Sequence, residues 1–97
     1  MDTPRFRLYV TGVTPRSRRA ADAVRAFCAQ RWGEDFELSI IDILQDPAGA
    51  GEDGVLATPT LLRIAPEPRI RVIGDMSNAM ALAQALGLDP TGAADVA

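Results

Sequence analysis

The spacing of hydrophobic residues along the chain predicts strands and helices in alternation. Residues 5–11 alternate between arginine and apolar side chains and then become mostly apolar, as a strand does. Farther on, four apolar residues recur at helical spacing: Ala20, Val24, Phe27 and Cys28. Thr14 offers a hydroxyl as N-cap, and Pro15 fits the first helical position, where a missing N–H is harmless. Because Gly33 is a natural stop, we expect a helix over residues 15–32.

The middle of the chain predicts a second strand and a weak second helix. Residues 36–44 are rich in β-branched side chains and nearly continuous in apolar character, which is typical of a strand buried on both faces of a parallel sheet. Asp46 and Pro47 repeat the combination of cap and proline. Glycines follow closely, and each interior glycine costs a helix about 0.8–1 kcal/mol relative to alanine. The second helix is therefore expected to be short, loose or partly unformed.

The C-terminal half predicts two short strands and a final helix. Residues 60–64 and 69–73 are strand-like runs, and the prolines between them fit a hairpin with a stiff loop rather than a tight turn. Residues 76–86 are rich in Ala and Leu, with apolar positions at helical spacing. Gly87 closes this helix, and Pro90 prevents its resumption.

The predicted order is therefore β-α-β-α-β-β-α. The first β-α-β unit must cross over right-handed to form a parallel pair, and the hairpin adds antiparallel strands. This is the minimal thioredoxin-like α/β arrangement with a mixed four-stranded sheet. We expect one domain over residues 1–87 and a flexible C-terminal tail over residues 88–97.

Composition and length agree with one folded domain. Of the 97 residues, 47% are hydrophobic and 24% are charged, which excludes wholesale disorder. No apolar run approaches the roughly 18 residues that a membrane span needs. The first residues are polar and lack the apolar core of a secretion signal. We therefore expect a cytoplasmic protein without membrane contact.

The charges are distributed unevenly along the chain. Residues 1–33 carry seven arginines against two acids, a net charge of +5, and residues 34–97 carry three arginines against eleven acids, a net charge of −8. This asymmetry suits an electrostatically oriented protein contact, although arginines that merely solvate one helix remain the common alternative. Nucleic acid is not an expected partner, because the basic stretch lacks interleaved exposed aromatic residues and the whole chain is acidic.

The residue types exclude several kinds of chemistry. Histidine is absent, and a single cysteine cannot form an internal disulfide or a Cys-x-x-Cys site. Thioredoxin-like oxidoreductases carry reactive cysteines where the first strand turns into the first helix, but residues 12–17 contain no sulfur. Ser17 cannot replace a thiolate in disulfide exchange. Because Cys28 falls on the apolar stripe, we expect it to be a core thiol. The sequence predicts no catalytic residue, cofactor or metal site.

The acidic residues offer few candidates for catalysis. The clusters around Glu34 and Glu52 lie at element ends beside glycine, where solvated acids and caps are common, and Glu37 and Asp53 belong to these clusters. Asp42 lies inside the second predicted strand and needs a partner, either a structural hydrogen bond or an ion pair with an arginine. Pro59 heads the third strand, where thioredoxin-like folds place a cis peptide bond.

Four blocks of this sequence, in order and spacing, resemble the KaiB family of cyanobacterial clock proteins. The similarity covers about residues 6–86, and the blocks that read Leu-Ala-Thr-Pro-Thr-Leu and Ile-Gly-Asp-x-Ser-Asn are the most specific. The four blocks are Leu8 to Pro15, Ile41 to Pro47, Leu56 to Leu61 and Ile73 to Asn78.

The resemblance implies binding rather than catalysis. Proteins of this family use two folds of one sequence: a homotetramer ordered β-α-β-β-α-α-β and a thioredoxin-like monomer. The thioredoxin-like form binds the N-terminal ATPase ring of KaiC, recruits KaiA and displaces a sensor histidine kinase that has a KaiB-like domain. The resemblance thus implies a KaiC-like ATPase as partner, with a KaiA-like protein, a sensor histidine kinase, or further copies in a dimer or tetramer as additional partners, in a circadian or related timing or stress pathway.

The resemblance also implies positions for these functions. The second strand would offer an edge to a further partner, and the segment around the second helix would face the ATPase ring. Departures from the family pattern include Ser39 and Gly54, each at a position of lysine in the cyanobacterial pattern. The implied partner-binding residues are Glu37, Ser39, Ile41, Asp46, Pro47, Glu52, Asp53, Leu56, Ala57, Thr58 and Pro59. The implied fold-state residues are Pro59, Pro66, Pro68, Gly74 and Asp75.

Of the two folds, we expect the thioredoxin-like one, because residues 79–86 prefer a helix where the alternative needs a strand. Exchange between the folds would be slow, since proline isomerisation takes tens of seconds or longer. Two other functions remain open. One is a thioredoxin-like adaptor or sensory domain that acts with a histidine kinase, and the other is a redox or transferase enzyme.

Overall fold

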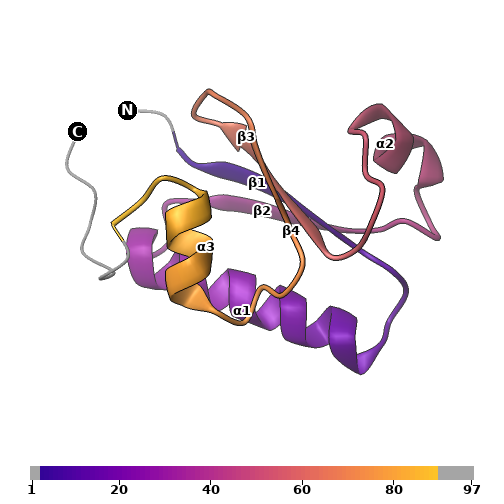
Figure 1. The fold of residues 1–97 in the computed structure, drawn as a ribbon, viewed down its shortest axis with the longest axis horizontal. Coiled ribbons are helices and arrows are strands. Elements are labelled where there is room, and N and C mark those ends of the chain that lie inside the picture. The colour runs from indigo at the N-terminus through magenta and orange to yellow at the C-terminus, as the bar shows by residue number, and fades with distance from the viewer. Residues whose placement is uncertain (1–2, 90–97) are drawn as a thin grey trace.

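The computed structural model describes residues 3–89, and within them the elements follow in the predicted order β-α-β-α-β-β-α (Figure 1). The elements are β1 (Arg5–Val10), α1 (Pro15–Trp32), β2 (Glu37–Asp42), α2 (Pro47–Glu52), β3 (Thr60–Ala65), β4 (Ile70–Ile73) and α3 (Ala79–Ala85).

The strands form one mixed sheet in the order β2-β1-β3-β4. β1 pairs parallel with β2, and both the β1–β3 and β3–β4 pairs are antiparallel. α1 and α3 lie on the same side of the sheet, whereas α2 lies apart from both at the end where β1 and β2 finish (Figure 1). The expectation of a thioredoxin-like α/β fold with a mixed four-stranded sheet is confirmed.

α1 forms over the predicted residues because its local signals agree. The Thr14 hydroxyl accepts a hydrogen bond from the Ser17 N–H at 3.0 Å, and Pro15 occupies the first turn. At the other end Gly33 adopts a φ of 62°, a left-handed conformation that favours glycine. The predicted apolar stripe from Ala20 to Cys28 is buried.

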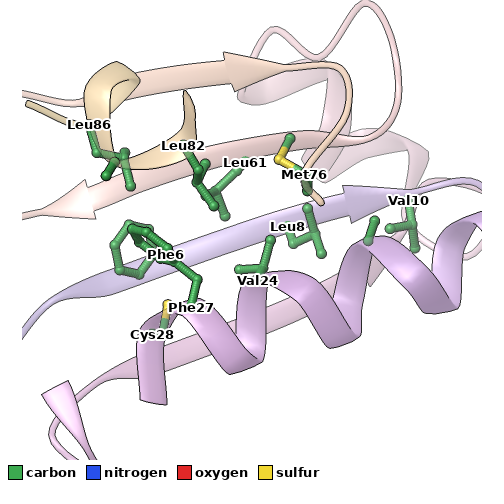
Figure 2. Close-up of a cluster of buried hydrophobic side chains, with 12 residues drawn as sticks. Phe6, Leu8, Val10, Val24, Phe27, Cys28, Leu61, Met76, Leu82 and Leu86 are labelled. Atoms are coloured by element: carbon green, nitrogen blue, oxygen red, sulfur yellow. The ribbon is translucent and has the colours of Figure 1, made fainter. Parts of the chain in front are cut away.

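The core lies between this stripe and the sheet (Figure 2). The inward side chains of β1, namely Phe6, Leu8 and Val10, contact α1 on one side and reach Leu61 of β3 in the centre. From α3 and the residues on either side of it, the core receives four more buried side chains: Met76, Leu82, Ala83 and Leu86.

The prediction that the second strand is buried on both faces is wrong. β2 lies at the edge of the sheet, and its residues are exposed or half-buried, with Ile40 at 36% exposure. Leu38, on the inward face, packs against the core, and Ile41, on the opposite face, is half-buried. The strand is also shorter than predicted, because the chain turns at Asp42, whose carbonyl accepts the N–H groups of Gln45 and Asp46.

The final helix begins three residues later than the predicted Met76. The Asp75 carboxylate accepts hydrogen bonds from the Ser77 N–H at 2.8 Å and the Ser77 hydroxyl at 2.6 Å, which holds a turn there. Asn78 then caps the helix by accepting from the Ala81 N–H at 3.0 Å. Ala79, which belongs to the predicted apolar stripe, is exposed because it lies at the first position of α3.

Three proline peptide bonds are cis, those preceding Pro59, Pro66 and Pro68. The first agrees with the expectation drawn from thioredoxin-like folds. A second fold of the same sequence stays a prediction. Of the predicted tail, Leu88 packs against the core, and residues 90–97 lie outside the described residues. Among the helices within residues 3–89, none is long and apolar enough to cross a membrane.

We predict that Leu61→Ala lowers the free energy of unfolding by about 2–5 kcal/mol, because Leu61 is fully buried and its truncation leaves a cavity. The control is Met80→Ala, which changes a side chain that is 59% exposed and should shift stability by no more than about 0.5 kcal/mol. Urea denaturation followed by circular dichroism measures both, and equal effects would contradict the described core.

Candidate functional site

The corner between β1 and α1 is the position at which thioredoxin-like oxidoreductases carry their cysteines. Here it forms a hollow of about 340 Å³ whose polar groups include hydroxyls. Ser17 donates to the Thr11 carbonyl at 3.0 Å, and the hydroxyls of Thr11 and Thr58 lie 2.6 Å apart. These hydroxyls bond to each other and to the backbone. Neither a carboxylate nor a thiol lies among the residues that line the hollow, which are Val10, Thr11, Thr14, Arg16, Ser17, Thr58 and Pro59.

Cys28 lies well inside the core, as predicted. Its thiol is fully buried on the apolar stripe of α1. Burial raises the pKa of Cys28 to about 12, so the thiol stays protonated at neutral pH. Because the thiolate is the reactive form of cysteine, this residue is held in an inert state.

Asp42 has the structural hydrogen bonds that its position requires. Its carboxylate accepts the N–H of Gly12 at 2.8 Å and the N–H of Leu44 at 2.9 Å. Of the two alternatives, a structural hydrogen bond and an ion pair with an arginine, the structure shows the hydrogen bonds. Asp42 thereby fastens the corner to the end of β2.

α2 is short, as its glycines predict. Asp46 caps it by accepting from the Gly49 N–H at 3.0 Å, and Pro47 follows at the first position. Ala50 is its buried residue. The chain then turns back through Val55, whose N–H donates to the Ala50 carbonyl at 2.9 Å.

Asp53, at the end of α2, is not the solvated acid that the sequence predicted. Its side chain is only 9% exposed. Arg7 of β1 donates to its carboxylate at 2.8 Å, the Tyr9 hydroxyl donates to the same oxygen, and Arg69 lies 4.0 Å from the other oxygen. Its neighbour Glu52 is exposed, in agreement with the prediction. We call Asp53, Arg7, Tyr9 and Arg69 the Asp53 cluster.

The electrostatics of the Asp53 cluster favour one protonation state. Burial works to raise the pKa of Asp53, but the hydrogen bonds from Tyr9 and Arg7 outweigh it and hold that pKa below its usual value. Burial, together with the Asp53 carboxylate, raises the pKa of Tyr9 to about 12. The hydrogen bond to Asp53 raises the pKa of Arg7. At neutral pH the cluster therefore joins an ionised carboxylate to a protonated hydroxyl and a guanidinium.

Four large apolar side chains are exposed at the end of the sheet where β1 and β2 finish and β3 begins. Leu56, in the segment between α2 and β3, is 93% exposed. Val13 and Leu44 follow β1 and β2, and Ile73 ends β4 beside the start of β3. We call Val13, Leu44, Leu56 and Ile73 the apolar rim. The sequence singled out only Leu56, because exposure at the other positions depends on how the loops meet.

The candidate partner-binding residues fall in two places. Glu37, Ser39 and Ile41 lie on β2 at the edge of the sheet, with Glu37 3.0 Å from Arg5 of the neighbouring strand. The others lie between Asp46, the N-cap of α2, and Pro59, beside the apolar rim. Asp46, Pro47, Glu52 and Ala57 are exposed there, Thr58 is half-buried and Pro59 is buried.

The candidate fold-state residues also separate in space. Pro66 and Pro68 lie in the turn between β3 and β4, at the far end of the sheet from the apolar rim. Gly74, which has a φ of 113°, lies beside the rim, where its N–H donates to the Pro59 carbonyl at 3.2 Å. Asp75 follows and holds the turn before α3.

Comparison with known proteins assigns this architecture to a family. The KaiB domain matches residues 7–88, most of the chain. The chain belongs to the KaiB family. This KaiB-family chain is 38% identical over 87 residues to the circadian clock protein KaiB3 of Synechocystis, a match that covers 90% of this chain and 85% of that protein. It is 44% identical over 73 residues to the circadian clock oscillator protein KaiB of Prochlorococcus marinus, covering 75% and 70% of the two chains.

Solved structures agree on the fold. The N-terminal domain of SasA from Synechococcus elongatus superimposes with a TM-score of 0.72 at 22% identity, covering 90% of this KaiB-family chain and 86% of that domain. Mitochondrial thioredoxin 3 from Saccharomyces cerevisiae superimposes with a TM-score of 0.67 at 17% identity, covering 90% and 79%. At these identities the likeness shows a thioredoxin-like fold, and the curated relatives show a link to the circadian clock.

We predict that Cys28 does not react with an aromatic disulfide reagent at pH 8 in the native protein, because its pKa of about 12 leaves almost no thiolate and burial blocks access. Absorbance of the released thiolate measures the reaction, and unfolding in urea should make the same thiol react completely. Rapid modification of the native protein would contradict the buried position.

We predict that Asp53→Asn lowers the free energy of unfolding at pH 7 by about 1.5–3 kcal/mol, since the bonds it weakens are charge-assisted. The native pKa of Asp53 is depressed, so this stabilisation is present above the ordinary carboxyl pKa of 3.8 and is lost as pH falls through the native value.

Urea titrations of wild type and Asp53→Asn at pH 7, 5 and 3 measure this difference. The gap between the two should persist from pH 7 to pH 5 and narrow at pH 3. The control is Glu52→Gln, an exposed acid next in sequence, which should stay close to wild type throughout. A gap that stays unchanged at pH 3 would show that the pKa of Asp53 is not depressed.

Proposed function

We propose that this chain is a non-catalytic, clock-related protein of the cytoplasm that binds and regulates a KaiC-type ring ATPase through the apolar rim. Its membership of the KaiB family, whose curated relatives are circadian clock proteins, supports this function. The observation that carries the proposal is Leu56, which is 93% exposed within the Leu-Ala-Thr-Pro-Thr-Leu block that gives the family resemblance.

Exposed apolar side chains that gather at one place are typical of protein-binding surfaces. The apolar rim brings together side chains from three loops and one strand end. The Asp53 cluster and the Thr11–Thr58 hydrogen bond hold the two ends of the segment that carries Leu56. A surface that is already shaped loses less conformational entropy on binding than a mobile one. The rim therefore suits docking on another folded protein.

The corner between β1 and α1 supports binding in place of redox chemistry. It carries threonine and serine hydroxyls where an oxidoreductase needs a thiolate, and Cys28 lies inside the core. A redox or transferase enzyme would need a thiolate or a base that activates a hydroxyl, and the residues that line this corner include neither a thiol nor a carboxylate.

A further partner would use β2. The edge of this strand, with Glu37, Ser39 and Ile41, offers backbone groups that can pair with an incoming strand. A KaiA-like protein and a sensor histidine kinase are the candidates for this position. A homodimer or homotetramer and a second fold also stay predictions.

We predict that Leu56→Glu weakens binding to the KaiC-type ring ATPase of the same organism roughly 30-fold, the loss expected when a central apolar contact is replaced. The matched control is Met80→Glu, which places the same charge on an exposed apolar position of α3, away from α2 (Figure 1). Its affinity should stay within about twofold of wild type.

Binding is measured with purified proteins by interferometry in the presence of ATP. Equal losses for Leu56→Glu and Met80→Glu would contradict docking through the apolar rim. Wild-type protein that binds a sensor histidine kinase and never a ring ATPase would instead favour the adaptor function.

A further inference from the structure

The segment from Asp53 to Pro59 joins α2 to β3 without regular secondary structure, yet it carries the exposed Leu56. Segments of this kind open easily unless side-chain contacts hold them to a stable element. At its far end the segment is fastened by Thr60, whose hydroxyl donates to the Ala57 carbonyl at 2.5 Å, and by the Thr11–Thr58 hydrogen bond. At its near end the attachment is Asp53.

Asp53 bonds to two strands that are not neighbours in the sheet. Its carboxylate accepts hydrogen bonds from Arg7 and Tyr9 of β1, and its backbone carbonyl accepts a hydrogen bond from the Arg71 guanidinium of β4 at 2.8 Å. β3 lies between β1 and β4, so these bonds hold the start of the segment across the face of the sheet opposite α1 and α3.

Gly54 makes the contact with Arg71 possible. A Cβ at this position would lie 3.2 Å from the Arg71 guanidinium, which is tighter than ordinary van der Waals contact. The φ of 68° at Gly54 also lies in the left-handed region that favours glycine. The chain therefore turns sharply directly after Asp53 and sends Leu56 outward.

We propose that Asp53 is a positioning residue: by bonding to Tyr9 and Arg7 it fixes the segment from Gly54 to Thr58, and thereby presents Leu56 to the partner. This inference rests on the proposed function for the identity of the partner. The fixing of the segment itself is a property of the free protein. Fixing the segment in advance raises affinity because less conformational freedom is lost on binding.

The first test measures amide hydrogen exchange of residues 54–58 in the free protein. Tyr9→Phe removes the hydroxyl that bonds to Asp53 while keeping the ring, and Asp53→Asn removes the charge while keeping the shape. Both should speed exchange in this segment roughly tenfold while the core of β1 and β3 keeps its protection. The matched control Glu52→Gln, an exposed acid one residue earlier, should leave exchange unchanged.

The second test measures affinity for the KaiC-type ring ATPase with the same variants. Tyr9→Phe and Asp53→Asn should weaken binding roughly tenfold, and neither change should weaken it further when Leu56 is already alanine. Such non-additivity distinguishes positioning of Leu56 from a general loss of stability. A general loss of stability would weaken binding equally in the wild-type chain and in Leu56→Ala. Circular dichroism and urea denaturation establish that each variant is folded at the assay temperature.

Unchanged exchange at residues 54–58 in folded Tyr9→Phe and Asp53→Asn would overturn the proposal whatever the partner is. Faster exchange with unchanged affinity, or fully additive losses with Leu56→Ala, would overturn it as well. Wild-type protein that binds no ring ATPase would refute the proposed function, and the exchange measurement would still decide whether Asp53 fixes the segment.

Discussion

The alternation of side chains along β1 couples the interior of the molecule to its candidate binding surface. Phe6, Leu8 and Val10 point into the core and contact α1, whereas Arg7 and Tyr9 point to the opposite face and bond to Asp53. Because successive side chains of a strand point to opposite faces, neither set can shift without the other. The segment that carries Leu56 is thus held by the strand that also organises the core.

Elements whose signals are local could be predicted from the sequence. α1 has a cap, a first-turn proline, an apolar stripe and a terminal glycine within one stretch of chain, and all of them operate as expected. The exposure of β2 could not be predicted because its apolar run resembles that of a central strand, and nothing local shows that the strand lies at the edge of the sheet. The family resemblance rests on ordered blocks rather than on any one element, and the comparisons confirm it.

The binding surface could be predicted only in part, for a similar reason. Each residue of the apolar rim lies in one of the four blocks that carry the family resemblance, but only the folded chain brings them to one end of the sheet, from three loops and a strand end. Alternation along β1 already places Arg7 and Tyr9 on the face opposite the core. Their partner Asp53 lies more than forty residues away, so only the folded chain shows that this acid is enclosed.

The edge position of β2 has a consequence for any strand that pairs with it. Along this strand Glu37, Ser39 and Ile41 share the face opposite α1, whereas Leu38 and Ile40 share the face toward α1. Side chains directly opposite each other on paired strands lie on the same face and interact there. An incoming strand therefore matches this edge when its apolar side chains fall beside Leu38 and Ile40 and its polar ones fall beside Glu37 and Ser39.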